Sequence, residues 1–145
     1  QVCVLQYLGE YYKGHGDTEK SLHFMRRMLQ VDFTQSIAVI AQCRDLLTDD
    51  PQNADAKITM AEAYFNRENY DGAIEITQDL VHRGENELDA TILLIKLYFK
   101  KGDFTSMRKV LESRRLDLFE NKKFYDFYRK TKWLFMHFTS DYGGL

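Results

Sequence analysis

The four histidines carry the imidazole groups that could bind a metal ion or transfer protons near neutral pH. They are His15, His23, His82 and His137. Their separations do not match the short spacings by which a helix or loop presents two ligands to one ion. Asp49 and Asp50 are adjacent carboxylates, but we interpret them as the end of a helix before Pro51 rather than as a catalytic pair. The sequence therefore predicts no metal site and no acid–base pair.

A glycine-bearing segment, GEYYKGHGDT at residues 9–18, partly resembles a phosphate-binding loop in composition. It lacks the Gly-Lys-Ser/Thr ending and the preceding strand of such a loop, so we interpret it as a turn between helices. The two cysteines, Cys3 and Cys43, are too few for a disulfide framework or a four-thiolate metal site. We expect both to be buried, reduced thiols, because both lie among apolar residues at helical spacing. No serine or cysteine has a recognisable catalytic partner, so we expect no catalytic residue, no cofactor and no enzymatic activity.

Composition indicates one helical domain of ordinary charge. The 145 residues carry a formal charge of −2 and a single proline, and 14% of them are aromatic. The near balance of charges gives no overall positive field for nucleic acid or an anionic membrane. No apolar stretch approaches the roughly 18 residues of a membrane span, and no signal peptide is recognisable. We expect a cytoplasmic protein, and the start at Gln1 in mid-pattern suggests a piece of a longer chain.

Aromatic and basic side chains occur together near the C-terminus, in KKFYDFYRKTKWLFMHF. Such a mixture is typical of partner-binding surfaces, in which Tyr, Trp and Arg contribute most. The candidate partner-binding residues are Tyr125, Tyr128, Arg129, Lys132 and Trp133. The alternative interpretation is a solvated helix face, as for the other basic pairs of the chain.

The elements that would position these residues form a repeat. The apolar pattern of residues 53–85 recurs in the segment that follows it, so that Met60, Tyr64 and Ala73 correspond to Leu94, Tyr98 and Met107. Within each copy, apolar residues recur at spacings of three, four and seven, which predicts two amphipathic helices joined by a tight turn. Asn53 is placed to cap one helix, and Gly84 to end another. A hairpin this thin cannot bury its apolar face alone, so we expect consecutive hairpins to stack.

The repeated unit, about 34 residues long, resembles the tetratricopeptide repeat, which carries large and small residues, Tyr, Gly and Ala at fixed offsets. The matching residues are Met60-Ala61, Tyr64, Tyr70 and Ala73, then Leu94-Ile95, Tyr98, Gly102 and Phe104, and nearer the N-terminus Leu8-Gly9, Tyr12, Gly16 and Ser21. The resemblance implies an all-α fold, a right-handed αα-solenoid of helix-turn-helix repeats. We expect one fragment of a longer array, with units near 2–33, 54–87 and 88–115, a lone helix at 34–49 and a partial unit at 122–145.

The lone helix breaks the period. The first unit starts near Val2 and the clean one at Ala54, and this spacing falls short of two full units by the length of one helix and its turn. Either one helix is absent around Val31–Phe33, or the array contains a true one-helix insert.

Some tetratricopeptide domains bind a C-terminal carboxylate through Lys and Asn on inward-facing helix positions. Here we expect the inward positions to be Lys57, Thr59 and Ala61, followed by Thr91, Leu93 and Ile95. They contain no Lys–Asn pair, which disfavours that role.

Two longer strings, residues 43–74 and 90–104, are similar to late repeats of the tetratricopeptide subunit of intraflagellar transport complex A. The features shared are a cysteine helix ending in a double leucine, an Asp-x-x-Asn turn, a Met-Ala helix and a Tyr-x-x-Ala helix. The resemblance implies a non-enzymatic scaffold of ciliary trains for retrograde transport and cargo entry. Its partners would be the WD40-plus-repeat subunits of that complex, and it would reside in the cytoplasm, at the cilium and at its base. The alternative hypotheses are an interaction scaffold of another assembly and, third, an enzyme or nucleic-acid binder built on the array.

Overall fold

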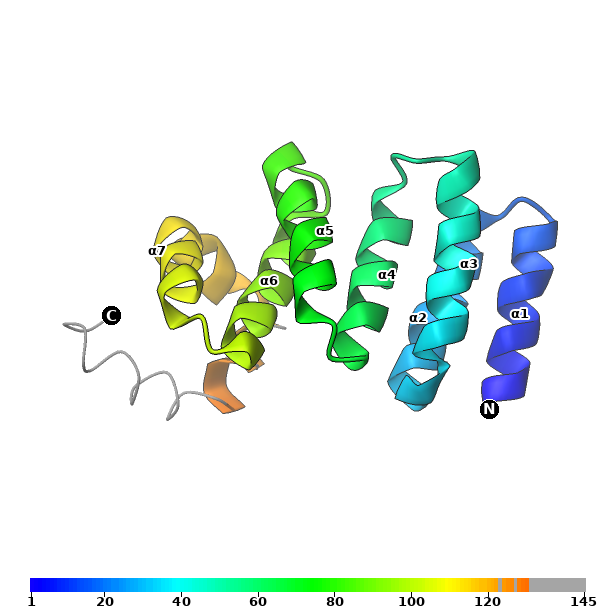
Figure 1. Ribbon diagram of the computed structural model, residues 1–145, viewed down its shortest axis with the longest axis horizontal. Coiled ribbons are helices and arrows are strands. Elements are labelled where there is room, and N and C mark those ends of the chain that lie inside the picture. Colours follow the sequence, from blue (N-terminus) through cyan, green and yellow to red (C-terminus); the bar gives the residue numbers. More distant parts are fainter. Residues whose placement is uncertain (123, 127, 131–145) are drawn as a thin grey trace.

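The computed structural model describes residues 1–122, 124–126 and 128–130, and this part of the chain is helical without a strand. The helices are α1 (Val2–Gly14), α2 (Thr18–Val31), the 3-10 turn η1 (Phe33–Gln35), α3 (Ser36–Asp49), α4 (Ala54–Asn66), α5 (Tyr70–Arg83), α6 (Glu87–Lys101) and α7 (Phe104–Glu120). They stand side by side from α1 at one end to α7 at the other (Figure 1). The predicted all-α solenoid is thereby confirmed.

The helix ends lie where the sequence places them, because the capping residues bind the free backbone groups there. The side chain of Asn53 accepts a hydrogen bond from the amide of Ala56 at 2.9 Å, and Asn69 caps the start of α5 in the same way. Gly84 and Gly102 end α5 and α6 with φ of 70° and 79°, a left-handed conformation that favours glycine. The predicted cap at Asn53 and stop at Gly84 are confirmed.

Three hairpins carry buried residues at the same two positions, one on each helix. The pairs are Gly9 with Ser21, Ala61 with Ala73, and Ile95 with Met107, and all six residues are buried. In the first pair the hydroxyl of Ser21 donates to the carbonyl of Gly9 at 2.8 Å, so the backbones of α1 and α2 approach closely. The α1–α2, α4–α5 and α6–α7 hairpins are therefore equivalent units.

The single helix α3 lies between the first two hairpins. It packs mainly on α4 and makes few contacts with α2, to which the 3-10 turn η1 joins it. At this joint Phe33 and Ile37 are exposed. Whether a helix is absent around Val31–Phe33 or α3 is a true insert stays a prediction.

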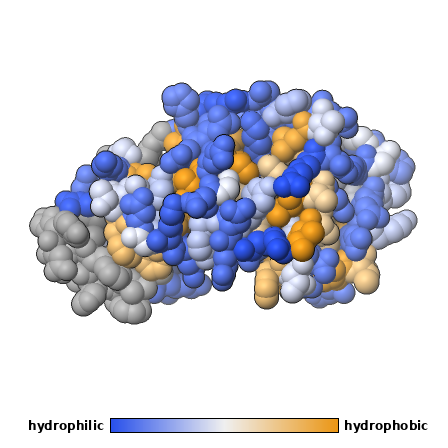
Figure 2. All heavy atoms as spheres, in the orientation of Figure 1, coloured by the Kyte–Doolittle hydropathy of each residue, from blue (hydrophilic) through white to orange (hydrophobic). Residues whose placement is uncertain are grey.

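The interior consists of two apolar clusters that meet at α4. One joins α1, α2 and α3 to the face of α4 that carries Ala56 and Ala63. The other begins at Ile58 and Ala61 of α4 and extends through α5, α6 and α7. The surface in Figure 2 is mostly hydrophilic, with apolar groups in scattered places.

Candidate partner-binding groove

A groove of about 420 Å³ crosses three helices, α2, α4 and α6. Its apolar lining residues are Leu29, Phe65, Ile92 and Leu93. Its polar lining residues are Arg26, Gln30, Glu62, Asn66, Asp89 and Lys96. A concave surface with apolar residues and a few polar groups suits a segment of another polypeptide that presents both kinds of side chain.

Each helix contributes one stripe to the groove. The stripe of α4 consists of Glu62, Phe65 and Asn66, at relative positions zero, three and four, and the stripe of α2 has the same spacing from Arg26. Residues at these spacings lie on one face of a helix. Glu62 and Lys96 occupy the same position of consecutive units, so an acid and a base alternate along the groove.

The position of the single helix α3 explains why α2 lines the groove together with α4 and α6. In an array of hairpins, alternate helices lie in alternate layers. Helix α2 is the second helix of its hairpin, whereas α4 and α6 are the first helices of theirs. Because the single helix α3 lies between α2 and α4, α2 falls in the same layer as α4 and α6. The irregularity in the period thus widens the groove by one helix.

Arg26 holds α2 against α4. Its Nε donates to the hydroxyl of Thr59 at 2.9 Å, and that hydroxyl donates to the carbonyl of Asp55 at 2.7 Å. Thr59 is buried and Arg26 is half-buried. The wall of the groove between α2 and α4 therefore includes a polar contact as well as apolar packing.

The two cysteines differ in environment, and the expectation that both are buried is wrong for Cys3. Cys43 lies in the interior beside α4, and burial raises the pKa of its thiol to about 12. Arg26 opposes this shift in pKa and Glu62 adds to it. Cys3 is exposed, whereas the buried residues of α1 are Leu5 and Gly9. Apolar neighbours in the sequence do not show which face of α1 is covered.

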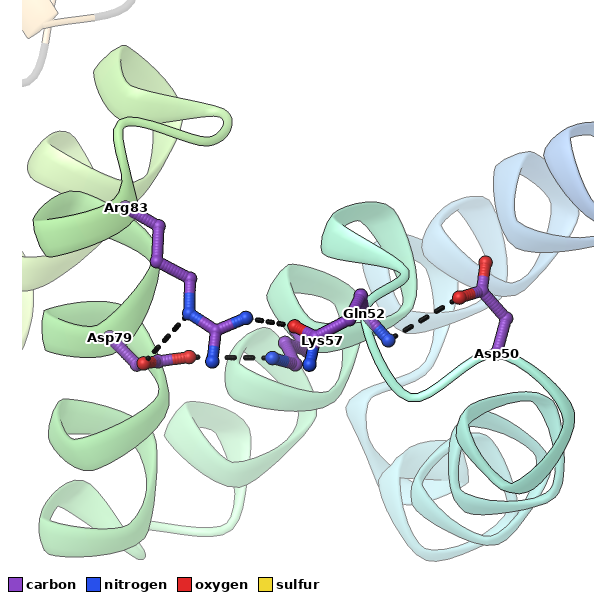
Figure 3. A network of polar contacts seen from close by, with 5 residues as sticks. All are labelled: Asp50, Gln52, Lys57, Asp79 and Arg83. Carbon is purple, nitrogen blue, oxygen red and sulfur yellow. Dashed lines mark hydrogen bonds and ion pairs between the residues drawn. The ribbon is translucent and has the colours of Figure 1, made fainter.

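A second polar cluster lies on the α3–α4 loop, α4 and α5 (Figure 3). Asp79 accepts hydrogen bonds from Lys57 at 3.3 Å and from Arg83 at 3.1 Å. Arg83 also donates to the side chain of Gln52, whose backbone amide donates to Asp50 at 3.3 Å. The charges of Lys57, Asp79 and Arg83 are paired with one another, so the cluster joins the α4–α5 hairpin to the preceding loop.

The expected inward positions require correction. Lys57 turns toward Asp79 of α5, and Ala61 and Ile95 pack in the apolar cluster of their hairpins. Of the six residues, only Leu93 lines the groove. The groove stripes of α4 and α6 differ from the expected ones, because the first helix of a unit faces the groove with a different stripe from the one that contacts its partner.

A Lys–Asn combination is therefore present after all, in Lys96 and Asn66. Glu62 and Asp89 line the same groove, so the groove has no net positive charge that would favour a carboxylate. The carboxylate-binding role remains disfavoured, on the ground of charge rather than of residue type.

The structure places part of the predicted C-terminal surface. Tyr125 is 48% exposed and Arg129 is exposed. Tyr128 is half-buried, and its ring stacks on that of Phe124 with centroids 6.4 Å apart. These three candidates lie away from the groove lining, whereas Lys132 and Trp133 lie outside the described residues. A role of the five in partner binding stays a prediction.

Within residues 1–122, 124–126 and 128–130, His, Cys, Asp and Glu nowhere gather in threes as they would around a metal ion. In the same part of the chain no helix has both the length and the apolar composition to cross a membrane.

The fold and the groove define an α-helical repeat protein with a concave surface. A family model described as a tetratricopeptide repeat matches residues 32–90, which include α3, α4 and α5. The match covers less than half of the chain, and it shows that this part is similar to the tetratricopeptide repeat. Among curated proteins, none matches the chain.

Sequence reasoning misses most of the groove residues. From the sequence, Arg26 is interpreted as one of several scattered surface charges, and Asn66 as part of a polar break between helices. Both residues line the groove. One signal in the sequence could find them. In each of the three helices, groove residues follow Arg26, Glu62 or Asp89 at spacings of three and four. This signal is useful only if α2, α4 and α6 are known to lie in the same layer.

Proposed function

We propose that the protein is a non-enzymatic scaffold that holds a segment of a protein partner in the groove formed by α2, α4 and α6. The single observation that carries the proposal is the geometry of this groove, in which apolar residues from three helices lie beside both acidic and basic side chains. Such a surface can bind an extended or helical segment through apolar anchors and select it by charge.

The finer proposal is a subunit of intraflagellar transport complex A, with its WD40-plus-repeat subunits as partners. It rests on the similarity of residues 43–74 and 90–104 to late repeats of that family's tetratricopeptide subunit. The protein would then act in the cytoplasm, at the cilium and at its base, in retrograde transport and cargo entry. The alternative is an interaction scaffold of another multisubunit assembly, which the groove supports equally well.

A charge reversal inside the groove tests both the binding role of the groove and the proposed membership of complex A. The chain, its Lys96→Glu variant and a matched Lys100→Glu variant are used to capture partners from ciliated-cell extract, which are identified by mass spectrometry. Lys96 lines the groove, whereas Lys100 is exposed on the same helix outside it. We expect complex A subunits with the chain and with Lys100→Glu, and at least tenfold less with Lys96→Glu.

Two other outcomes are informative. Recovery of a different assembly that Lys96→Glu abolishes would refute the ciliary identity and retain the scaffold. Equal recovery by all three proteins would show that the groove is not the binding surface. Circular dichroism of each variant confirms that the helices are intact.

A further inference from the structure

The guanidinium of Arg26 is anchored at one end. Its Nε donates to the hydroxyl of Thr59, and this hydroxyl donates in turn to the carbonyl of Asp55. Because the hydroxyl accepts from one neighbour and donates to the other, its orientation is fixed. Thr59 is fully buried, so water does not compete for these two bonds. The side chain of Arg26 therefore reaches the groove in a position that α4 determines.

The other end of the guanidinium is open. Among the described residues, the two Nη atoms of Arg26 make no hydrogen bond or ion pair, and neither is buried without a partner. Since Arg26 lines the groove and is half-buried, these N–H groups are accessible from the groove. A guanidinium presents its N–H groups in a rigid, planar fork, which matches the two oxygen atoms of a carboxylate. Pre-organisation of such a fork lowers the entropy that binding costs.

The other groove residues of α2 are uncharged. Leu29 and Gln30 follow Arg26 by three and four residues, which places all three on one face of the helix. Within the described part of the chain, the side chain of Gln30 makes no hydrogen bond, so its amide can also bind a polar group of a ligand. Phe65 of α4 adds apolar surface to the same groove. A ligand of Arg26 would therefore bind beside an amide and apolar side chains.

The carboxylates of the groove limit the charge of that ligand. Glu62 and Asp89 line the groove together with Arg26 and Lys96, so the formal charges of the lining cancel. A phosphoryl group or a run of acidic residues would bring several negative charges close to Glu62 and Asp89, whereas a single carboxylate brings one. The lack of net positive charge disfavours the capture of a free C-terminus. A side-chain carboxylate differs, because the apolar contacts of its own segment hold it at the groove.

We propose that Arg26 determines the specificity of the groove, and that its ligand is a single acidic side chain, Asp or Glu, of the bound segment. Thr59 is a positioning residue, because it acts through Arg26. The recognition depends on a feature of this chain, since Arg26 belongs to α2, which the single helix α3 places beside α4 and α6. The inference rests on the proposed function, because it names the chemistry of the segment that the groove holds.

The test uses short random peptides as the probe. A library of them, each fused through its C-terminus to a phage coat protein, is selected on the full chain, so that no peptide has a free terminal carboxylate. Peptides whose binding Lys96→Glu abolishes are groove ligands. These are synthesised with amidated C-termini, in their selected form and with the acid replaced by the corresponding amide. Fluorescence anisotropy measures the affinity of both forms for the chain, for Arg26→Gln and for the matched variant Arg27→Gln, at an exposed neighbouring position of α2.

We expect the groove ligands to share one Asp or Glu. Their amide forms should bind the chain at least about tenfold more weakly, because a charge-assisted hydrogen bond is lost. Arg27→Gln should give the same ratio. With Arg26→Gln the two forms should bind equally, because the residue that distinguishes them is gone. Thr59→Val, which removes the anchor of Arg26, should reduce the ratio and leave the affinity of the amide form unchanged.

The outcomes separate this inference from the proposed function. Groove ligands without a shared acid, or a ratio that persists in Arg26→Gln, would overturn the inference and leave the scaffold standing. Tighter binding of a peptide with phosphoserine in place of the acid would overturn it in favour of a phosphoryl ligand. If no selected peptide depends on Lys96, the proposed function is wrong and the inference falls with it. Circular dichroism shows that each variant is folded, and the comparison of the two peptide forms on the chain itself needs no variant.

Discussion

Small residues set the distance between paired helices, and Ala61 is the clearest example. It is buried where α4 meets α5, in the same cluster as Ala73. A larger side chain there would force the two backbones apart. We expect Ala61→Trp to reduce the free energy of unfolding by about 3 kcal/mol, near the upper end of typical overpacking costs.

Urea titration followed by circular dichroism measures this change. The matched variant is Ala41→Trp, because Ala41 is exposed on α3, and it should change stability by less than about 0.5 kcal/mol. If Ala61→Trp unfolds at the same urea concentration as the chain, the register of the α4–α5 hairpin is misplaced.

The two thiols should differ in reactivity as they differ in burial. Burial raises the pKa of Cys43 to about 12, so at pH 8 this group is a neutral thiol, whereas thiolate is the nucleophilic form. Cys3 is exposed. Iodoacetamide at pH 8 should add one label to the folded protein, at Cys3, and a second only after denaturation, as read by peptide mass spectrometry. Two labels on the folded protein would contradict the placement of Cys43.

The raised pKa of Cys43 makes the free energy of unfolding depend on pH. A thiol whose pKa is higher in the folded than in the unfolded chain favours folding at pH below the unfolded value near 9. This contribution decreases as pH rises from about 9 toward 12, because the unfolded chain loses the proton first.

At the scale of elements, the hairpins are more predictable than their layers. The turns, the cap at Asn53 and the stop at Gly84 follow from local chemistry, which acts within a few residues. The groove depends on which stripe of each helix faces inward, and that depends on the single helix α3 between α2 and α4. The burial of Ala56 depends likewise on the neighbouring helices of its cluster, so the composition near this residue could not predict it.

Helix α2 packs mainly on its hairpin partner α1, and it also reaches α4 across the groove. Its contact with α4 includes the bond from Arg26 to Thr59, and its contact with α3 is slight. We expect Arg26→Ala to cost about 1–2 kcal/mol, because it removes a bond from a charged donor that joins two helices. Amide exchange should accelerate in α1 and α2 while α6 and α7 remain unchanged. Arg27→Ala, at an exposed neighbouring position, is the control. Uniform acceleration in all helices would contradict a local role.

At the scale of the molecule, α4 contributes opposite faces to the two apolar clusters and so connects them. In a solenoid each unit contacts only its neighbours, so stability is transmitted along the array through such shared helices. Ile58 is buried on the face of α4 toward α5. We expect Ile58→Ala to cost about 3 kcal/mol, within the range for deletion of a large core side chain.

The distribution of that effect distinguishes a continuous solenoid from two independent halves. If the array is continuous through α4, native-state amide exchange should accelerate on both sides, in α2 and α3 as well as in α5 and α6. Leu22→Ala, deep in the α1–α3 cluster, should instead affect mainly α1 to α3. A loss of protection by Ile58→Ala that stops at α4 would show that the clusters unfold separately. The groove, which needs α2, α4 and α6 together, could then lose one wall without unfolding the remainder.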